Sequence, residues 1–175
     1  MDQQAIEFRR ATEGDEPAIR ALVRSERLNP TGLDWPNFIV AATGERIVGA
    51  VQMRRHADGS REVGSLVVAE QERGRGIASR MMEALLAAER EPVWMITGES
   101  HARTWAQWGF RRIEPSAAPV RVRFNYRIGR LARILSFLRR QPARPLVILE
   151  RQPVERRRNS AAGASRQEIR VLAEG

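Results

Sequence analysis

The chain has 175 residues, a formal net charge of +9 at pH 7 and no cysteine. A chain of this length can bury the core of one domain, and the absence of cysteine excludes disulfides, thiolate metal sites and a cysteine nucleophile. Two histidines argue against a metal site, and no apolar run is long enough to span a membrane. The first ten residues lack the apolar core of a signal peptide, so we expect a cytoplasmic protein.

The basic residues are all arginine, and they are unevenly distributed. Residues 1–118 carry 16 Arg and 17 Asp or Glu, whereas residues 119–175 carry 14 Arg and 4 Asp or Glu. The first part is therefore nearly neutral and the second is strongly basic. Because lysine is absent throughout, the number of arginines reflects a compositional bias, and the asymmetry of charge is the more informative feature.

In the first half of the chain, the pattern predicts a strand over residues 6–10 and then a helix that ends near residue 25. Residues 29–32 break this helix, and residues 33–36 form a loop. Strands are expected over residues 38–41, 47–53 and 61–68. The Asp58-Gly59 pair predicts a hairpin turn between the last two of these strands, with His56 exposed in it.

In the second half, apolar spacing predicts a helix over residues 77–89, a strand over 93–97, a helix over 100–108 and a strand over 110–113. After Pro115 the pattern weakens. A further helix is expected from an apolar face formed by Ile128, Leu131, Ile134, Leu135 and Leu138, followed by a strand over residues 146–150. We therefore expect one domain over residues 1–150 with a basic helical insertion at about 119–144, and a disordered basic tail over 151–175.

The segment from Ser65 to Ser79 is the most informative part of the sequence. A β-branched strand leads through Arg73-Gly74-Arg75-Gly76 directly into a helix. The first N–H groups of a helix lack internal partners and lie at the positive end of its dipole, and glycines let a phosphate approach the main chain. The segment therefore predicts a diphosphate site, although an ordinary strand-to-helix connection with two glycines would give the same pattern.

The order of the predicted elements, with this turn after the fourth strand, resembles the GNAT acetyltransferase superfamily over residues 6–113 and 146–150. The motifs that carry the resemblance are Arg73 to Ala78, which matches an R/Q-x-x-G-x-G/A signature, the Trp108-Gly109-Phe110 helix end, and Glu62 on the fourth strand. It implies an α/β (α+β) fold with a mixed twisted sheet of about six to seven strands flanked by helices. Within the superfamily, the chain resembles stand-alone proteins similar to the acetyltransferase part of N-acetylglutamate synthases.

The resemblance implies an acetyl-CoA-dependent N-acetyltransferase that acts on a primary amine by direct attack, without a metal. Coenzyme A would be bound by Leu66, Val67, Val68, Arg73, Gly74, Arg75, Gly76, Ile77, Ala78 and Ser79. Glu62 would be the general base, although a solvated residue on an exposed strand would look the same. The acceptor would contact Asp34, Trp35, His101 and Tyr126; a buried Trp35 and a surface His101 are the structural alternatives.

The sequence leaves four questions open. Many family members have a tyrosine as the acid where this chain has Trp105, and Tyr126 is the only tyrosine that could replace it. The alternatives to an enzyme are therefore a non-catalytic module that binds coenzyme A as a sensor or scaffold, and a protein that binds RNA or an anionic membrane through residues 119–175. The acceptor amine and the pairing of two copies into a homodimer also stay open.

Overall fold

The computed structural model describes residues 5–26, 28, 32–87, 89–137 and 145–153. The strands are β1 (Glu7–Arg10), β2 (Phe38–Thr43), β3 (Arg46–Arg55), β4 (Arg61–Val68), β5 (Val93–Gly98), β6 (Arg111–Ile113) and β7 (Leu146–Arg151). The α-helices are α1 (Glu16–Ser25), α2 (Ile77–Ala87), α3 (Ala102–Trp105) and α4 (Val120–Phe137). Short 3-10 turns are η1 (Glu13–Asp15), η2 (Trp35–Asn37), η3 (Glu70–Glu72), η4 (Glu99–His101), η5 (Ala106–Trp108) and η6 (Pro115–Ala117).

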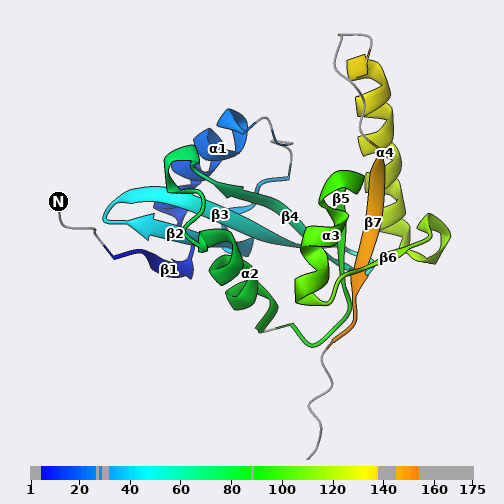
Figure 1. The fold of residues 1–175 in the computed structure, drawn as a ribbon, viewed down its shortest axis with the longest axis horizontal. Helices are drawn as coiled ribbons and strands as arrows, with labels where there is room; N and C mark the ends of the chain where they lie inside the picture. The colour runs from blue at the N-terminus through cyan, green and yellow to red at the C-terminus, as the bar shows by residue number, and fades with distance from the viewer. Residues whose placement is uncertain (1–4, 27, 29–31, 88, 138–144, 154–175) are drawn as a thin grey trace, which may run out of the picture.

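The strands form one seven-stranded sheet in the order β1-β2-β3-β4-β5-β7-β6. All neighbouring strands are antiparallel except β4 and β5, which are parallel. The sheet thus consists of an antiparallel half, β1 to β4, and a second antiparallel half, β5 to β7, joined by one parallel pair. In Figure 1, β7 runs steeply across the direction of β2 and β3.

Helices cover both faces of the sheet, because the side chains of each strand alternate between the two faces and form apolar clusters on both. The larger cluster packs α2 against the sheet and contains Met81, Met82, Val147 and Leu149. The opposite face carries two separate clusters, one under α1 and one under α4, and Ile148 belongs to the second. Within the described residues, no helix combines the length and the apolar character that a membrane crossing requires.

The predicted helix over residues 100–108 is wrong as one continuous element. The segment is a succession of η4, a single turn of α3 and η5. Its core-facing residues, Ala102, Trp105 and Trp108, recur every three positions, which is the period of a 3-10 helix and not of an α-helix. Gly109 ends the segment in the left-handed conformation at φ 81°.

The last helix begins at Val120, close to the start predicted for the basic helical insertion at about residue 119, but its buried face differs from the predicted one. The N–H of Arg121 in its first turn donates to the Asp58 carboxylate at 2.9 Å. Ile128 and Leu131 do not face the core, since they are 50% and 57% exposed, whereas Val122 is fully buried. The expected break at residues 29–31, the end of the predicted insertion at 138–144 and the predicted tail from residue 154 lie outside the described residues.

Candidate active site

The two halves of the sheet separate along β4. Strands β4 and β5 are paired only at Glu62 with Trp94 and at Val63 with Met95, whereas β5 pairs with β7 from Val93 to Gly98. The part of β4 after Val63 therefore has a main-chain edge that no described strand occupies on the β5 side. An extended ligand could add to this edge as a strand would.

β4 is also irregular at the same place. Between Gly64 and Val67 it has one residue more than the facing part of β3, so the ladder contains a bulge. Ser65 in the bulge has a φ of 53°, which is uncommon for a residue with a side chain. Arg54 donates to the Ser65 hydroxyl at 3.3 Å and helps to hold this conformation. The sequence did not predict the bulge.

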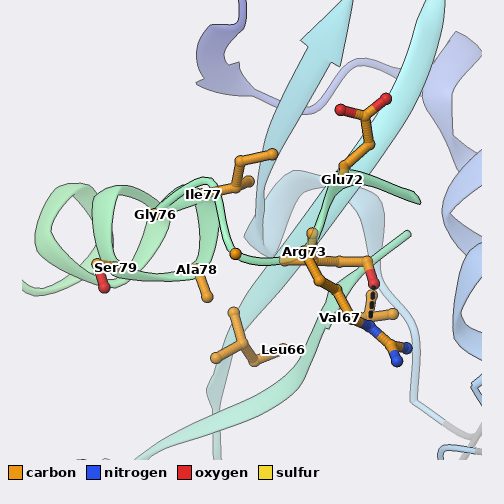
Figure 2. Close-up of a pocket in the computed structure, with 10 residues that line it drawn as sticks. Leu66, Val67, Glu72, Arg73, Gly76, Ile77, Ala78 and Ser79 are labelled. Carbon is orange, nitrogen blue, oxygen red and sulfur yellow. Dashed lines mark hydrogen bonds between the residues drawn. The ribbon is translucent and has the colours of Figure 1, made fainter. Parts of the chain in front are cut away.

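A pocket of about 290 Å³ lies between the end of β4 and the start of α2, and we call it the α2 pocket (Figure 2). It is lined by Leu66, Val67, Val68, Glu72, Arg73, Gly74, Gly76, Ile77, Ala78 and Ser79. Gly74 and Gly76 have φ angles of 77° and 72°, and no atom lies within 4 Å of where a Cβ would be. Because the first α2 N–H groups have no partner within the helix, the pocket offers main-chain donors to an anion.

The arginines of the turn are already engaged by carboxylates. Arg73 lines the α2 pocket, but its guanidinium lies 2.5 Å from Glu26, the residue that follows α1, and also donates to the Val68 carbonyl at 3.3 Å. Arg75 forms an ion pair with the buried Glu72, which also binds Arg46 at 2.5 Å. The positive potential in the pocket therefore comes mainly from the main chain and the helix dipole.

Nine of the ten residues predicted to bind coenzyme A line this pocket, and the tenth, Arg75, does not. Sequence reasoning missed Glu72, which lines the pocket and fixes Arg75. Its position three residues before Arg75 and two before the first glycine was the available signal, since an acid there can pair with the turn's arginines.

Glu62 is buried, not solvated, and is only 3% exposed. One carboxylate oxygen accepts a hydrogen bond from the Asn125 amide of α4 at 2.9 Å and lies 3.1 Å from His56 Nε2. The other lies 3.5 Å from the Arg54 guanidinium. Glu62 is thus surrounded by donors from β3, from the hairpin that follows β3 and from α4. The expectation of an exposed His56 is wrong, because its side chain is only 11% exposed.

These side chains belong to a hydrogen-bonded cluster of polar residues on the sheet face opposite α2, which we call the Glu62 network. Its members are Gln52, Arg54, His56, Glu62, Ser65 and Asn125. On β3 its members alternate at every second residue, and Arg54 is directly paired with Glu62. Gly64 leaves room for the Arg54 guanidinium, since a Cβ there would lie 2.9 Å from its Cζ. The polar alternation in β3 was the signal that sequence reasoning missed.

The residues predicted to contact an acceptor lie in three places. Asp34 and Trp35 belong to a loop that lies over β3, where Gln52 donates to the Gly32 carbonyl at 2.9 Å. His101 is exposed in η4, beside Ser100. The Tyr126 hydroxyl donates to the Leu146 carbonyl at 3.2 Å. Only the loop of Asp34 and Trp35 is linked by a described hydrogen bond to the Glu62 network.

Trp105 occupies the position where a family tyrosine was expected. Its indole N–H donates to the Thr97 hydroxyl at 3.3 Å, and its ring lies 5.5 Å from that of Trp108. An indole N–H does not give up a proton at neutral pH. Among the described residues, no three His, Asp or Glu side chains gather in a way that would hold a metal ion.

Comparisons with known proteins agree with this architecture. Residues 34–112 match the sequence model of a family described as acetyltransferase (GNAT) domain. No curated protein sequence matches the chain.

Three solved structures illustrate the likeness. N-acetylglutamate synthase from Neisseria gonorrhoeae, complexed with coenzyme A and N-acetyl-glutamate, has a TM-score of 0.67 at 19% identity, over 87% of this chain and 36% of that one. Rv2747 from Mycobacterium tuberculosis, in complex with CoA, has a TM-score of 0.61 at 22% identity, over 83% of this chain and 98% of that one. A GNAT-family acetyltransferase from Staphylococcus aureus has a TM-score of 0.60 at 14% identity, over 85% of this chain and 99% of that one. The chain thus spans about a third of the synthase's length.

Proposed function

We propose that this chain, whose residues 34–112 match the GNAT acetyltransferase family, transfers an acetyl group from acetyl-CoA to a primary amine. The observation that carries the proposal is the position of the α2 pocket at the end of β4, the same strand that carries the buried Glu62. Such a reaction needs a site that binds the acyl donor and a group that accepts the amine proton. The pocket would supply the first and the carboxylate the second.

The α2 pocket fits the phosphorylated part of coenzyme A. The main-chain N–H groups from Gly74 to Ser79 would bind the diphosphate, in the space that a Cβ at Gly74 or Gly76 would fill. The main-chain edge of β4 at Leu66 to Val68 would hold the pantetheine arm as an added strand. When bound, acetyl-CoA supplies a thioester whose acetyl carbon bonds to the amine nitrogen while its bond to sulfur breaks.

Glu62 would take the proton from the arriving ammonium, directly or through a water molecule. Asn125 and His56 fix one of its oxygens, so the carboxylate keeps a single orientation. The Arg54 guanidinium offsets part of the cost of burying a negative charge. The chain needs no nucleophile of its own, since the amine attacks directly, and this agrees with the lack of cysteine.

The N–H groups in the bulge of β4 would stabilise negative charge that develops on the acyl oxygen. A bulge turns main-chain donors out of the ladder, and donors that are fixed before the reaction need no reorganisation during it. With Trp105 in place of a tyrosine and the Tyr126 hydroxyl bonded to Leu146, the leaving thiolate would take its proton from solvent.

The Trp105 substitution also favours a second candidate function, a module that binds coenzyme A without catalysis. One experiment separates the two. The full-length protein is mixed with acetyl-CoA and, one at a time, with amino acids, polyamines, aminoglycosides, peptides and a lysine-containing protein, and release of free thiol is measured. Amine-dependent release supports the enzyme. Binding of coenzyme A without release over the whole panel favours the sensor, and no binding at millimolar concentration contradicts both.

A further inference from the structure

Helix α4 has one face that packs on the sheet and one that does not. On the packed face, Val122 is fully buried with Ala118 and Ile148, and a Cβ at Gly129 would lie 3.2 Å from a Leu146 methyl. Past these contacts the helix continues beyond the start of β7, and in Figure 1 its last turns (yellow) rise above that strand.

The outer face of α4 carries an exposed apolar stripe. Val120, Phe124, Ile128 and Leu131 are 67%, 49%, 50% and 57% exposed. They are spaced by four, four and three residues, so they lie along one side of the helix over about 16 Å. They are also four of the five large apolar side chains that are exposed among the described residues. We call them the α4 stripe.

Arginines flank this stripe on both sides. Arg121 precedes Phe124 by three positions and lies over its ring at 5.3 Å, while Arg127 and Arg130 are exposed on the other side. Within the part of the chain that the structure describes, no carboxylate lies within ion-pair distance of these three guanidinium groups. In the sequence, residues 115–149 contain eight Arg and no Asp or Glu.

We propose that the α4 stripe docks the protein on an anionic membrane surface, with the apolar side chains in the interface and the flanking arginines on lipid phosphates. A helix with a row of apolar side chains bordered by arginines binds such a surface by combining apolar burial with electrostatic attraction, and the long arginine side chains reach up to the headgroups. This goes beyond the proposed acetyl transfer and does not depend on it.

The chemistry of the stripe favours lipid over the other occupants. Two α4 helices packed stripe to stripe would bring their arginine rows together without a carboxylate to compensate, which Coulomb repulsion opposes. RNA would be bound by the arginines but would leave the aliphatic side chains without partners, because single strands bind by stacking on aromatic rings. An anionic bilayer satisfies both parts of the surface.

The test is sedimentation of the full-length protein with two kinds of vesicle, pure phosphatidylcholine and phosphatidylcholine with one-third phosphatidylglycerol. We expect binding to the anionic vesicles that weakens as salt is added, and little binding to the neutral ones. The double variant Phe124→Ser/Leu131→Ser should lower the partition coefficient at least ~10-fold, and Arg127→Gln/Arg130→Gln should lower it and flatten its salt dependence.

Matched controls separate the stripe from general effects. Leu28→Ser removes another exposed apolar side chain and Arg24→Gln another exposed arginine, and neither should change binding. All variants should keep the circular dichroism spectrum and the Tm of the wild type, which shows that they fold. The proposal is overturned if binding is absent, if it is equal for both vesicles, if the stripe variants bind like the controls, if RNA competes the protein off the vesicles, or if Phe124→Ser/Leu131→Ser converts a dimer to a monomer.

Discussion

The α2 pocket and the Glu62 network are built from different parts of the chain, main-chain groups in the first and side chains in the second. The pocket is formed by consecutive residues between Leu66 and Ser79, and its donors are main-chain N–H groups. The network is formed by side chains from β3, β4 and α4, and its bond between Asn125 and Glu62 joins residues 63 positions apart. A phosphate group can be recognised by any chain with the right backbone, whereas an acceptor must be recognised by particular side chains.

The first prediction concerns the network. Replacing Glu62 by Gln keeps the shape of the side chain and removes its capacity to accept a proton. We expect kcat with an amine identified by thiol release to fall by about 10²–10⁴, the usual contribution of a general base. The affinity for coenzyme A, measured by calorimetry, should stay the same, since Glu62 does not line the α2 pocket. Glu83→Gln, an exposed change on α2, is the control. Unchanged kcat in Glu62→Gln would remove Glu62 from the mechanism.

The second prediction concerns the pocket. Gly76→Asp places a side chain and a negative charge in the space that a diphosphate would occupy. We expect the affinity for coenzyme A to fall at least ~100-fold, from lost main-chain contacts and from charge repulsion. Gly59→Asp is the control, because Gly59 has a similar φ of 81° and equally open surroundings but lies in the hairpin between β3 and β4. Equal losses in the two variants would mean that backbone strain, not the pocket, is responsible.

The third prediction concerns the orientation of Glu62. Asn125→Ala removes the shortest described hydrogen bond to its carboxylate. Leaving a buried carboxylate oxygen without this hydrogen bond costs about 1–3 kcal/mol of free energy. We therefore expect kcat to fall about 10-fold or more. The Kd for coenzyme A should not change. Asn125→Gln, which keeps an amide, should restore part of kcat; a fall in stability with no change in kcat would limit Asn125 to a structural role.

The smallest effect is expected at the start of α4. The pKa of Asp58 is lowered to about 2 by hydrogen bonds from the Ser60 hydroxyl and from the Arg121 N–H. Because the folded pKa lies below the unfolded value of about 3.9, the stabilisation is complete above that value and is lost as pH falls through about 2. Asp58→Ala should lower the free energy of unfolding at neutral pH by about 1 kcal/mol.

Chemical denaturation between neutral pH and the acid range checks this. Asp58→Asn keeps an acceptor oxygen but does not titrate, so it should retain part of the stability and lose the pH dependence that belongs to Asp58. Equal pH dependence in wild type and Asp58→Asn would contradict the assignment.

The same comparison explains how much could be predicted from the sequence. Seven strands, the helices α1 and α2 and the Gly74–Gly76 turn follow from local periodicity and turn chemistry, and the structure confirms them. The buried face of α4 was predicted wrongly, because Ile128 and Leu131 are exposed and the first turn of the helix is held instead by Asp58, far away in sequence. The contact between His56 and Glu62 was missed because it depends on the register of β3 and β4, which a sequence pattern does not state.

We propose that main-chain amides at the start of α2 bind the diphosphate of coenzyme A, and a crystal structure of the protein with coenzyme A would show whether they do. We expect diphosphate oxygens within hydrogen-bonding distance of the N–H groups between Gly74 and Ser79, with the pantetheine along β4. A diphosphate bound elsewhere, or this corner filled by protein side chains in the complex, would contradict it.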